Sequence, residues 1–391
     1  MFQNKRIRLG LLSTSHLAND FLYNIYIAIL PLLHIWYGLS YTQMSTIVLF
    51  HGLVGGFLQP LLATFSDRRE KPWFIPLGFF LLGAGMFIIY LSDQFILLLV
   101  AVLLASFGSA AFHPDANRCV HRLPGKNRGS IQSVFQIGGN SGMALAPVSL
   151  WFLTQTGTDG TIWLGMIAIL FSLFFLFFTM KTETGHAPLK KKGAQGGKPP
   201  IHPGIVALVA VVASRSIANT GILTFLPLYY IATYGLSTDE VWVFTFLLLS
   251  GGALGTIAGG PLGDRFGMRH VTQYSLVLST PLALLLPWIS GVAAMICLFL
   301  LGLVMMSTFS VSVVYAQELM PERAGLASSL VIGLTGGIAG IVQLMLGVAA
   351  DSYGLFPILC AIVLMPAVGA ILCFFLPKTE RLTVELDHVV K

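Results

Sequence analysis

Apolar runs of about 20 residues recur along the whole chain, and this is the length that an α-helix needs to cross a bilayer. Only 10% of the 391 residues are charged, whereas soluble proteins average about 25%. We therefore expect an all-α membrane protein. The predicted twelve transmembrane helices are residues 9–33, 43–65, 73–91, 95–117, 128–154, 161–180, 203–231, 240–262, 270–289, 292–316, 324–350 and 355–376.

The basic residues partition between the two sides of this twelve-helix topology. All but one of the 22 Lys and Arg residues fall at the termini or in every second connection, the exception being Arg215. The positive-inside rule therefore places both termini and the basic loops in the cytoplasm, with the protein in the inner membrane. The net charge of +6 follows from this topology, so we expect no nucleic-acid partner. The opposite connections carry only the acidic residues Asp93, Asp159, Asp239, Glu240 and Asp351.

The two halves of the chain repeat each other at a fixed offset. The segment YGLSYTQM begins at Tyr37 and YGLSTDEV begins at Tyr234, and the pair Asp-Arg at 67–68 recurs at 264–265 with the same spacing. Similarity at a fixed offset indicates duplication.

The duplication predicts two pseudo-symmetric six-helix bundles, residues 1–181 and 203–391. A solvated cytoplasmic linker, residues 182–202, joins them and is rich in Lys, Gly and Pro. Two parallel six-helix repeats describe the major facilitator architecture, in which substrate binds between the halves near the midplane.

Two loop motifs resemble those of the major facilitator superfamily. The segment GGPLGDRFGMR resembles the superfamily's signature, and PERAG resembles its partner motif beneath the tenth span. The first-half copy, ATFSDRREK, departs from the signature because Ala63 replaces its glycine. In such transporters these charges form cytoplasmic pairs that hold the outward-facing state; solvated loop charge is the alternative. The resemblance assigns gating roles to Asp67, Arg68, Asp264, Arg265, Glu322 and Arg323.

The first predicted span carries a carboxylate near its centre. Asp20 lies ~16 Å into the span at 1.5 Å per residue. A charge at that depth costs at least ~2.5–3.5 kcal/mol and usually marks a transport pathway or a proton relay. His16, Tyr23 and Asn24 lie three or four positions away, on the same helix face. We expect Asp20 to carry protons with the help of His16.

The seventh predicted span carries Arg215 at the same depth, with Asn219 one turn later. Because the repeat relates spans one and seven, Asp20 and Arg215 can face one cavity. A guanidinium binds a phosphonate or carboxylate in a bidentate way, so we expect Arg215 to bind an anionic substrate. The alternative is a permanent ion pair that only holds the halves together; it is disfavoured because a buried pair is a poor source of stability.

The fifth predicted span carries polar residues at four-residue spacing, flanked by glycines. Small residues permit close helix contact, so this stripe fits substrate binding and interhelical packing equally. The polar residues are Gln132, Gln136 and Asn140, and the glycines are Gly138, Gly139 and Gly142. Glycine pairs in spans eight and eleven, Gly251-Gly252 and Gly336-Gly337, favour packing surfaces.

The fourth predicted span ends in the polar sequence AFHPDANR. His113 titrates near neutrality, and Asp115 is spaced to pair with Arg118 at the cytoplasmic exit. We expect His113 and Asp115 to handle protons or substrate. The alternative is a helix kink at Pro114 with an interfacial salt bridge. His51 in the second span is expected to be a structural histidine.

Taken in order, these motifs resemble one narrower family, the fosmidomycin resistance transporters of the major facilitator superfamily. The resemblance rests on SHLAND, AFHPDANR, SVFQIGGNSG, GGPLGDRFG and VYAQELMPERAG, which together span nearly the whole chain. Members look like proton-coupled exporters of drugs or small anionic metabolites. Family motif positions are occupied by His16, Asn19, Asp20, His113, Asp115, Arg118, Gln136, Asn140, Tyr315, Gln317 and Glu318.

We therefore expect a secondary active transporter, a proton-coupled antiporter that exports a drug or small anionic metabolite by alternating access. Its partners are protons, a small-molecule substrate and the lipid bilayer, and it is expected to act as a monomer. The residues expected to carry protons are Asp20, His113 and His16. The residues expected to bind substrate are Arg215, Asn19, Tyr23, Asn24, Gln136, Asn140, Asn219 and Tyr315. Three further residues are expected to take part in gating: Asp115, Arg118 and Glu318.

Two other functions stay open at this point. One is an importer or uniporter of an organic anion or sugar in the same fold. The other is an intramembrane enzyme with His16 and Asp20 as a base–acid pair. No phosphate loop, metal-ligand set or nucleophile beside a base is present in the sequence, and the four cysteines have no paired spacing. We therefore expect no cofactor, no metal and no enzymatic activity.

Overall fold

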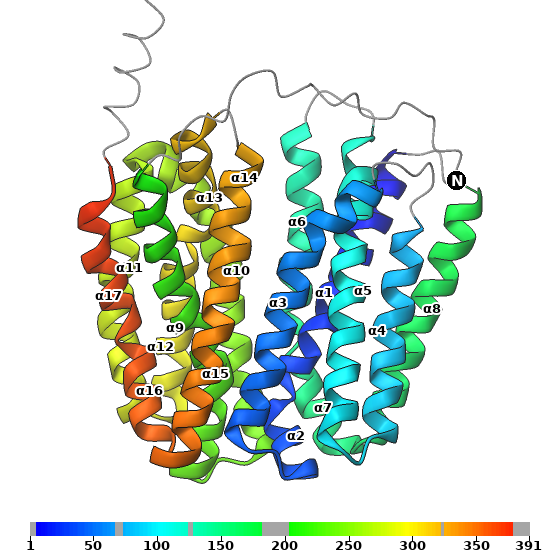
Figure 1. Cartoon of the computed structure of the whole chain (residues 1–391), viewed down its shortest axis with the longest axis horizontal. Helices are drawn as coiled ribbons and strands as arrows, with labels where there is room; N and C mark the ends of the chain where they lie inside the picture. The colour runs from blue at the N-terminus through cyan, green and yellow to red at the C-terminus, as the bar shows by residue number, and fades with distance from the viewer. Residues whose placement is uncertain (1–4, 67–72, 124–127, 182–202, 322–323, 378–391) are drawn as a thin grey trace, which may run out of the picture. The chain divides into compact units, whose positions relative to one another are not determined.

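The computed structural model describes residues 5–66, 73–123, 128–181, 203–321 and 324–377, in which every regular element is helical (Figure 1). The first half contains α1 (Lys5–Ala28), α2 (Leu30–Tyr37), α3 (Tyr41–Ser66), α4 (Phe74–Leu91), α5 (Phe95–His121), α6 (Arg128–Leu145), α7 (Val148–Thr156) and α8 (Asp159–Lys181). The second half contains α9 (Pro203–Tyr234), α10 (Thr238–Phe266), α11 (Met268–Leu285), α12 (Gly291–Met306), α13 (Thr308–Leu319), α14 (Ala324–Ser329), α15 (Thr335–Tyr353), α16 (Leu355–Val363) and α17 (Met365–Leu372). A π-helical segment, Leu330–Leu334, joins α14 to α15.

Eight helical segments in the described residues are long and apolar enough to cross a membrane, and α1 with α2, bent by 46°, makes a ninth if the pair forms one span. The predicted spans 43–65, 128–154 and 270–289 are also helical but are not among these segments. Polar side chains in α6 and α11 lower their mean hydropathy, and Pro147 separates α6 from α7. The helical, membrane-spanning character is confirmed, whereas the count of twelve and the cytoplasmic termini stay predictions.

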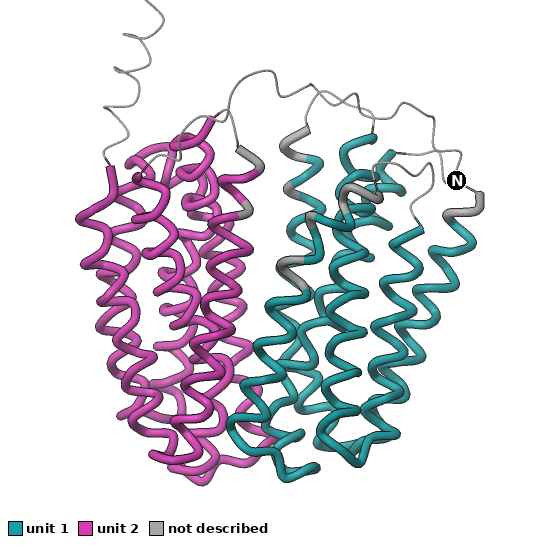
Figure 2. Tube along the Cα trace, in the orientation of Figure 1, with its two compact units in different colours: residues 1–197 teal, residues 198–391 magenta. Residues whose placement is uncertain are grey.

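The chain divides into two compact units, Met1–Gly197 and Lys198–Lys391 (Figure 2). Helix pairs inside the two units correspond. In the first unit α1 packs on α6, α3 on α5 and α4 on α8; in the second unit α9 packs on α15, α10 on α12 and α11 on α17. Corresponding contacts of this kind are what a duplicated six-helix bundle requires. The predicted linker 182–202 lies outside the described residues, so the domain boundaries stay a prediction.

Glycines let α10 lie directly against the backbone of α12. A Cβ on Gly251 would collide with the carbonyl oxygen of Phe299, and a Cβ on Gly255 would collide with that of Leu303. The predicted packing role of Gly251 is therefore confirmed. In α15 no described heavy atom lies within 4 Å of a Cβ built on Gly336, whereas Gly337, the other member of the predicted pair, is buried.

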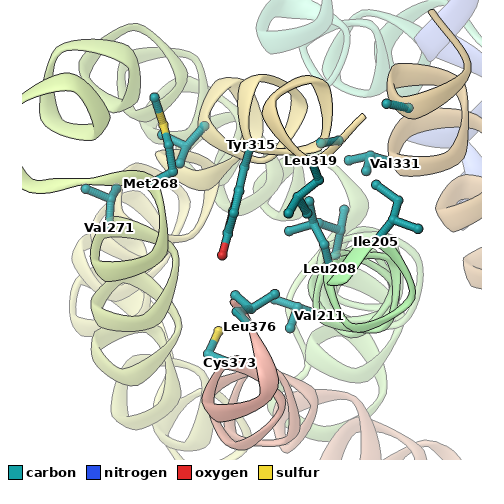
Figure 3. Close-up of a cluster of buried hydrophobic side chains, with 14 of the residues drawn as sticks. Ile205, Leu208, Val211, Met268, Val271, Tyr315, Leu319, Val331, Cys373 and Leu376 are labelled. Atoms are coloured by element: carbon teal, nitrogen blue, oxygen red, sulfur yellow. The ribbon is translucent and has the colours of Figure 1, made fainter. Parts of the chain in front are cut away.

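Tyr315 lies in the hydrophobic core of the second unit (Figure 3). Its side chain is 0% exposed, and its hydroxyl donates a hydrogen bond to the carbonyl oxygen of Pro377. This environment indicates a structural role, because α13 is tied to the end of the last helical segment. The surrounding apolar side chains include Ile205, Leu208, Val211, Met268, Val271, Leu319, Val331, Cys373 and Leu376.

Candidate functional site

Two histidine side chains of the first unit contact the carboxylate of Asp20 in α1. The Nε2 atom of His16 lies 3.3 Å from Oδ2 of Asp20, and Nε2 of His113 in α5 lies 3.5 Å from Oδ1. The side chains of His16 and Asp20 are 4% and 10% exposed, and that of His113 is 19% exposed. The one-turn spacing in α1 and the packing of α1 on α5 thus bring together the three residues predicted to handle protons.

Asn19 and Ser109 close a ring of contacts around this carboxylate. The Nδ2 atom of Asn19 donates to Oδ1 of Asp20 at 2.9 Å and to Oγ of Ser109 at 3.1 Å. The same Oγ lies 3.4 Å from Nε2 of His113. Asn19, predicted to bind substrate, is fully buried and orients Asp20 in this structure. Ser109 was not predicted, although it precedes His113 by four positions on the same helix face.

The backbone of α6 fixes the orientation of the His16 ring. Its Nδ1 atom lies 2.9 Å from the carbonyl oxygen of Phe135, whose ring stacks on the imidazole at 4.2 Å between centroids. A carbonyl only accepts hydrogen bonds, so Nδ1 carries a hydrogen. In a neutral imidazole Nε2 would then be a bare lone pair, facing another lone pair on Asp20. The His16–Asp20 pair therefore shares at least one proton in this arrangement.

The donor atoms of His16, Asp20 and His113 all lie within 4.8 Å of one another, a spacing that could hold a metal ion. Metal binding needs a deprotonated imidazole nitrogen. In this arrangement Asn19 donates to the other oxygen of the Asp20 carboxylate. The described geometry is therefore compatible with binding of a proton or of a metal ion.

Gly139 in α6 leaves the space that this cluster fills. A Cβ at Gly139 would lie 2.8 Å from Oδ2 of Asp20 and would collide with the ring of His16. Gly138 and Gly142 approach the main chain of α1 in the same way, so the predicted close contact along this glycine stripe is confirmed. Gly139 was predicted only as a packing residue. Its importance for the cluster is visible only once α1 and α6 are placed together.

Tyr23 links α1 to α3 through His51. The Tyr23 hydroxyl donates to the carbonyl oxygen of His51 at 2.5 Å, Nε2 of His51 lies 3.1 Å from the carbonyl oxygen of Tyr23, and the two rings stack at 3.8 Å. His51 therefore has the satisfied structural environment predicted for it. Asn24 donates to the carbonyl oxygen of Asp20 at 2.7 Å. Tyr23 and Asn24 were both predicted to bind substrate. In this structure each of the two side chains donates a hydrogen bond to a main-chain carbonyl oxygen of the first unit.

The polar stripe of α6 divides into two kinds of contact. Gln132 donates to Oδ1 of Asn117 at 3.1 Å, which ties α6 to α5. Gln136 donates to Oδ1 of Asn140 at 3.3 Å, and Gln136 is exposed on the unit's surface. The interhelical interpretation therefore fits Gln132, whereas Gln136 and Asn140 present polar groups that a substrate could reach.

Arg215 in α9 is a buried cation. It is 5% exposed, its Nη1 atom contacts the sulfur of Met306 at 3.0 Å, and its guanidinium carbon lies 5.5 Å from the centroid of the Phe309 ring. Its Nε atom has no hydrogen-bond partner among the described residues. Within the described part of the second unit, no carboxylate pairs with it. A buried charge without a counter-charge is unfavourable, so this environment favours an anion.

Asp115 and Arg118 form the buried pair that their spacing predicts. Nη2 of Arg118 lies 2.8 Å from Oδ1 of Asp115, and both side chains are less than one-tenth exposed. Oδ2 of Asp115 also accepts a hydrogen bond of 2.8 Å from the backbone N–H of Phe74 at the start of α4. A carboxylate at a helix N-terminus is favourable. The pair thus ties α5 to α4.

The remaining predicted gating residues belong to the second unit or fall outside the described residues. Asp264, Arg265 and Glu318 are exposed, and none of the three forms an ion pair with another described residue. Gln317 donates to Oγ of Ser328 at 2.9 Å, which ties α13 to α14. The residues outside the described ranges are Asp67, Arg68, Glu322 and Arg323. Asn219 is half-buried one turn after Arg215.

Comparison with known proteins finds similar sequences over nearly the whole chain. A sequence model described as the Major Facilitator Superfamily matches residues 12–342. An uncharacterized MFS-type transporter of Bacillus subtilis (strain 168), YfnC, is 35% identical over 378 residues, which cover 94% of this chain and 92% of that protein. The fosmidomycin resistance protein of Escherichia coli (strain K12) is 30% identical over 384 residues, which cover 95% of this chain and 93% of that protein.

Solved structures resemble the fold at low sequence identity. A bacterial homolog of the human lysosomal transporter Spinster, in an inward-facing and occupied conformation, superposes with a TM-score of 0.77 at 18% identity. The match covers 96% of this chain and 97% of that chain. Identity at this level supports the shared fold alone.

Proposed function

The chain belongs to the major facilitator superfamily, with the predicted resemblance to its fosmidomycin resistance transporters confirmed, and from this premise we propose that it is a proton-coupled antiporter that exports a small anionic compound. Membership makes it a transporter rather than an enzyme. The coupling ion, the direction of transport and the chemistry of the substrate belong to the proposal. So does the inner membrane as its location.

The observation that carries the proposal is the contact of Asp20 with two histidines inside the first unit. A carboxylate held by His16 and His113 can take up and release a proton without leaving an isolated charge in the bilayer. The carbonyl oxygen of Phe135 accepts a hydrogen bond from Nδ1 of His16 and so keeps a proton on that nitrogen. The proton that leaves on deprotonation is therefore the one shared by Nε2 of His16 and Asp20. The cluster can therefore couple proton uptake to rearrangement of α1 against α5 and α6.

Arg215 supplies the substrate part of the proposal. Its guanidinium is buried, and within the described second unit its recorded contacts are the Met306 sulfur and the Phe309 ring. A phosphonate or carboxylate would pair with the two parallel N–H groups of the guanidinium. A relative is named for resistance to fosmidomycin, a phosphonate, which agrees with this chemistry. We propose Asn219, one turn later, as a second polar contact.

Transport by the purified protein in lipid vesicles with an imposed pH gradient tests the proposal. Fosmidomycin and a simple carboxylate serve as anionic probes, and a neutral sugar serves as the comparison. The proposal expects anion flux that is driven by the proton gradient and abolished by its collapse. Gradient-independent flux would indicate a uniporter, and preferential movement of the sugar would refute the anionic substrate.

A further inference from the structure

A groove of about 510 Å³ lies in the second unit between α10, α11 and α12. Its walls follow one stripe on each of two helices: Ala258, Leu262 and Phe266 in α10, and His270, Tyr274 and Leu278 in α11. Four-residue spacing keeps each stripe on one face, and eight residues of helix extend ~12 Å. The groove thus runs parallel to the helices, in the direction that an extended hydrocarbon chain would take.

The surface around the groove is apolar and accessible. The side chains of Phe266, Tyr274 and Leu278 are 55%, 63% and 57% exposed, and the neighbouring Val277 and Leu254 are 46% and 51% exposed. An apolar patch of this kind marks a surface that contacts lipid or another apolar partner. In a membrane-spanning bundle the first occupant to consider is a lipid chain.

One end of the groove is cationic. The guanidinium carbon of Arg265 lies 5.3 Å from the centroid of the Phe266 ring, which lines the groove. At the same end His270 stacks on Tyr274, with 6.4 Å between ring centroids. Both Arg265 and His270 lie at or beside the α10–α11 connection, which the charge distribution predicts to be cytoplasmic.

The groove also has the depth of one lipid leaflet. The groove begins beside the α10–α11 connection. Its length of ~12 Å is close to half of the ~30 Å hydrocarbon core. A basic end at the cytoplasmic interface and an apolar interior match the two parts of an anionic phospholipid.

We propose that this groove binds one acyl chain of an anionic phospholipid of the cytoplasmic leaflet, with the lipid phosphate held by Arg265 and His270. Arg265 contributes a fixed charge, and His270 and Tyr274 contribute hydrogen-bond donors to the phosphate and ester oxygens. Neither Asp20 nor Arg215 is among the residues that line the groove.

Native mass spectrometry of the detergent-purified full chain tests this site. Phosphatidylglycerol and phosphatidylcholine with identical acyl chains are added in equal amounts. The wild type should retain one phosphatidylglycerol in preference to phosphatidylcholine. Arg265→Gln should reduce that preference about fivefold, the effect of one cation near an anionic headgroup. His270→Gln should reduce it as well, and Arg122→Gln in the first unit should leave it unchanged.

A second pair of variants tests the acyl chain. Leu278→Trp fills the inner end of the groove and should abolish retention of the lipid, whereas Val277→Trp, next to it and outside the lining, should not. Both side chains are exposed, so we expect both variants to fold like the wild type. A thermal unfolding curve checks that they do. Equal retention of both lipids by the wild type would overturn the proposal. Equal loss of lipid retention in the two Trp variants would also overturn it. So would a dimer that Leu278→Trp disrupts while lipid retention stays unchanged.

Discussion

The Nε2 atom of His16 faces Oδ2 of Asp20 at 3.3 Å while the main chain of α6 holds the other nitrogen of the same ring. This arrangement makes the two residues share a proton, because both acceptors would otherwise present lone pairs to each other. Removal of the carboxylate should therefore remove the proton site without opening the bundle.

Asp20→Asn should abolish proton-driven export and leave a folded protein. The amide has nearly the same shape, and it can still accept a hydrogen bond from Asn19, but it cannot carry the proton. Gradient-driven uptake into inverted vesicles measures transport, and gel filtration checks folding. Full gradient-driven transport by this variant would contradict the assignment of Asp20.

Gly139→Ala should disturb the same cluster without changing any ionisable group. The added methyl would lie 2.8 Å from Oδ2 of Asp20, so the carboxylate or the His16 ring must move. We expect a large loss of coupled transport.

Gly336→Ala is the matched control, because no described heavy atom lies within 4 Å of its Cβ. Alanine favours helix by up to about 1 kcal/mol over glycine, so this variant should be as stable as the wild type or more stable. Equal transport by Gly139→Ala and Gly336→Ala would argue against the crowded geometry at Asp20.

Arg215→Met should stabilise the substrate-free protein while it removes anion transport. Met replaces a buried charge that has no counter-charge in the described second unit, and a gain of at least about 1 kcal/mol is reasonable for such a change. Loss of a charge-assisted hydrogen bond, about 1.5–3 kcal/mol, corresponds to roughly 10- to 150-fold weaker anion binding. Thermal unfolding and a transport-independent binding assay measure the two effects.

Arg215→Lys keeps the charge but loses the planar fork, so it should retain partial activity. The double variant Asp20→Asn with Arg215→Gln separates substrate contact from charge neutralisation. If Arg215 contacts the anion, the double variant should be stable and fail to bind it. Normal anion binding by the double variant would refute the assignment.

Asp115→Asn should act on stability rather than on coupling. Asp115 pairs with Arg118 and accepts the N–H of Phe74, and removal of one partner from a buried pair costs about 3–5 kcal/mol. The melting temperature in detergent should fall clearly below that of Asp20→Asn. An unchanged melting temperature with lost transport would move Asp115 into the coupling machinery.

Cysteine labelling tests the predicted orientation. In a background without native cysteines, a cysteine at Asp159 should react with an impermeant reagent from outside the cell, and one at Lys191 should not. The physical reason is that the predicted twelve-span topology places every loop cation on one side of the membrane. The reverse pattern would exchange the two sides.

Periodicity and charge were sufficient to predict the helical fold, and helix spacing was sufficient to place His16 beside Asp20. The contact of His113 with Asp20 joins two helices that are far apart in sequence, so the sequence predicted a proton role for His113 but not this contact. The acceptor role of Phe135 belongs to a backbone carbonyl, which no side-chain pattern reveals. Tyr315 matched a family motif, yet its burial and its bond to Pro377 depend on how the end of the chain folds back.

Proton release on substrate binding tests the central claim most directly. Purified protein in weakly buffered detergent solution is mixed with fosmidomycin while a pH-sensitive dye reports free protons. If binding of the anion at Arg215 is coupled to release of the proton from Asp20, the wild type should release protons at saturation, and Asp20→Asn should release none while remaining folded. Proton release by Asp20→Asn equal to that of the wild type, or anion binding to the wild type with no proton release, would contradict the account.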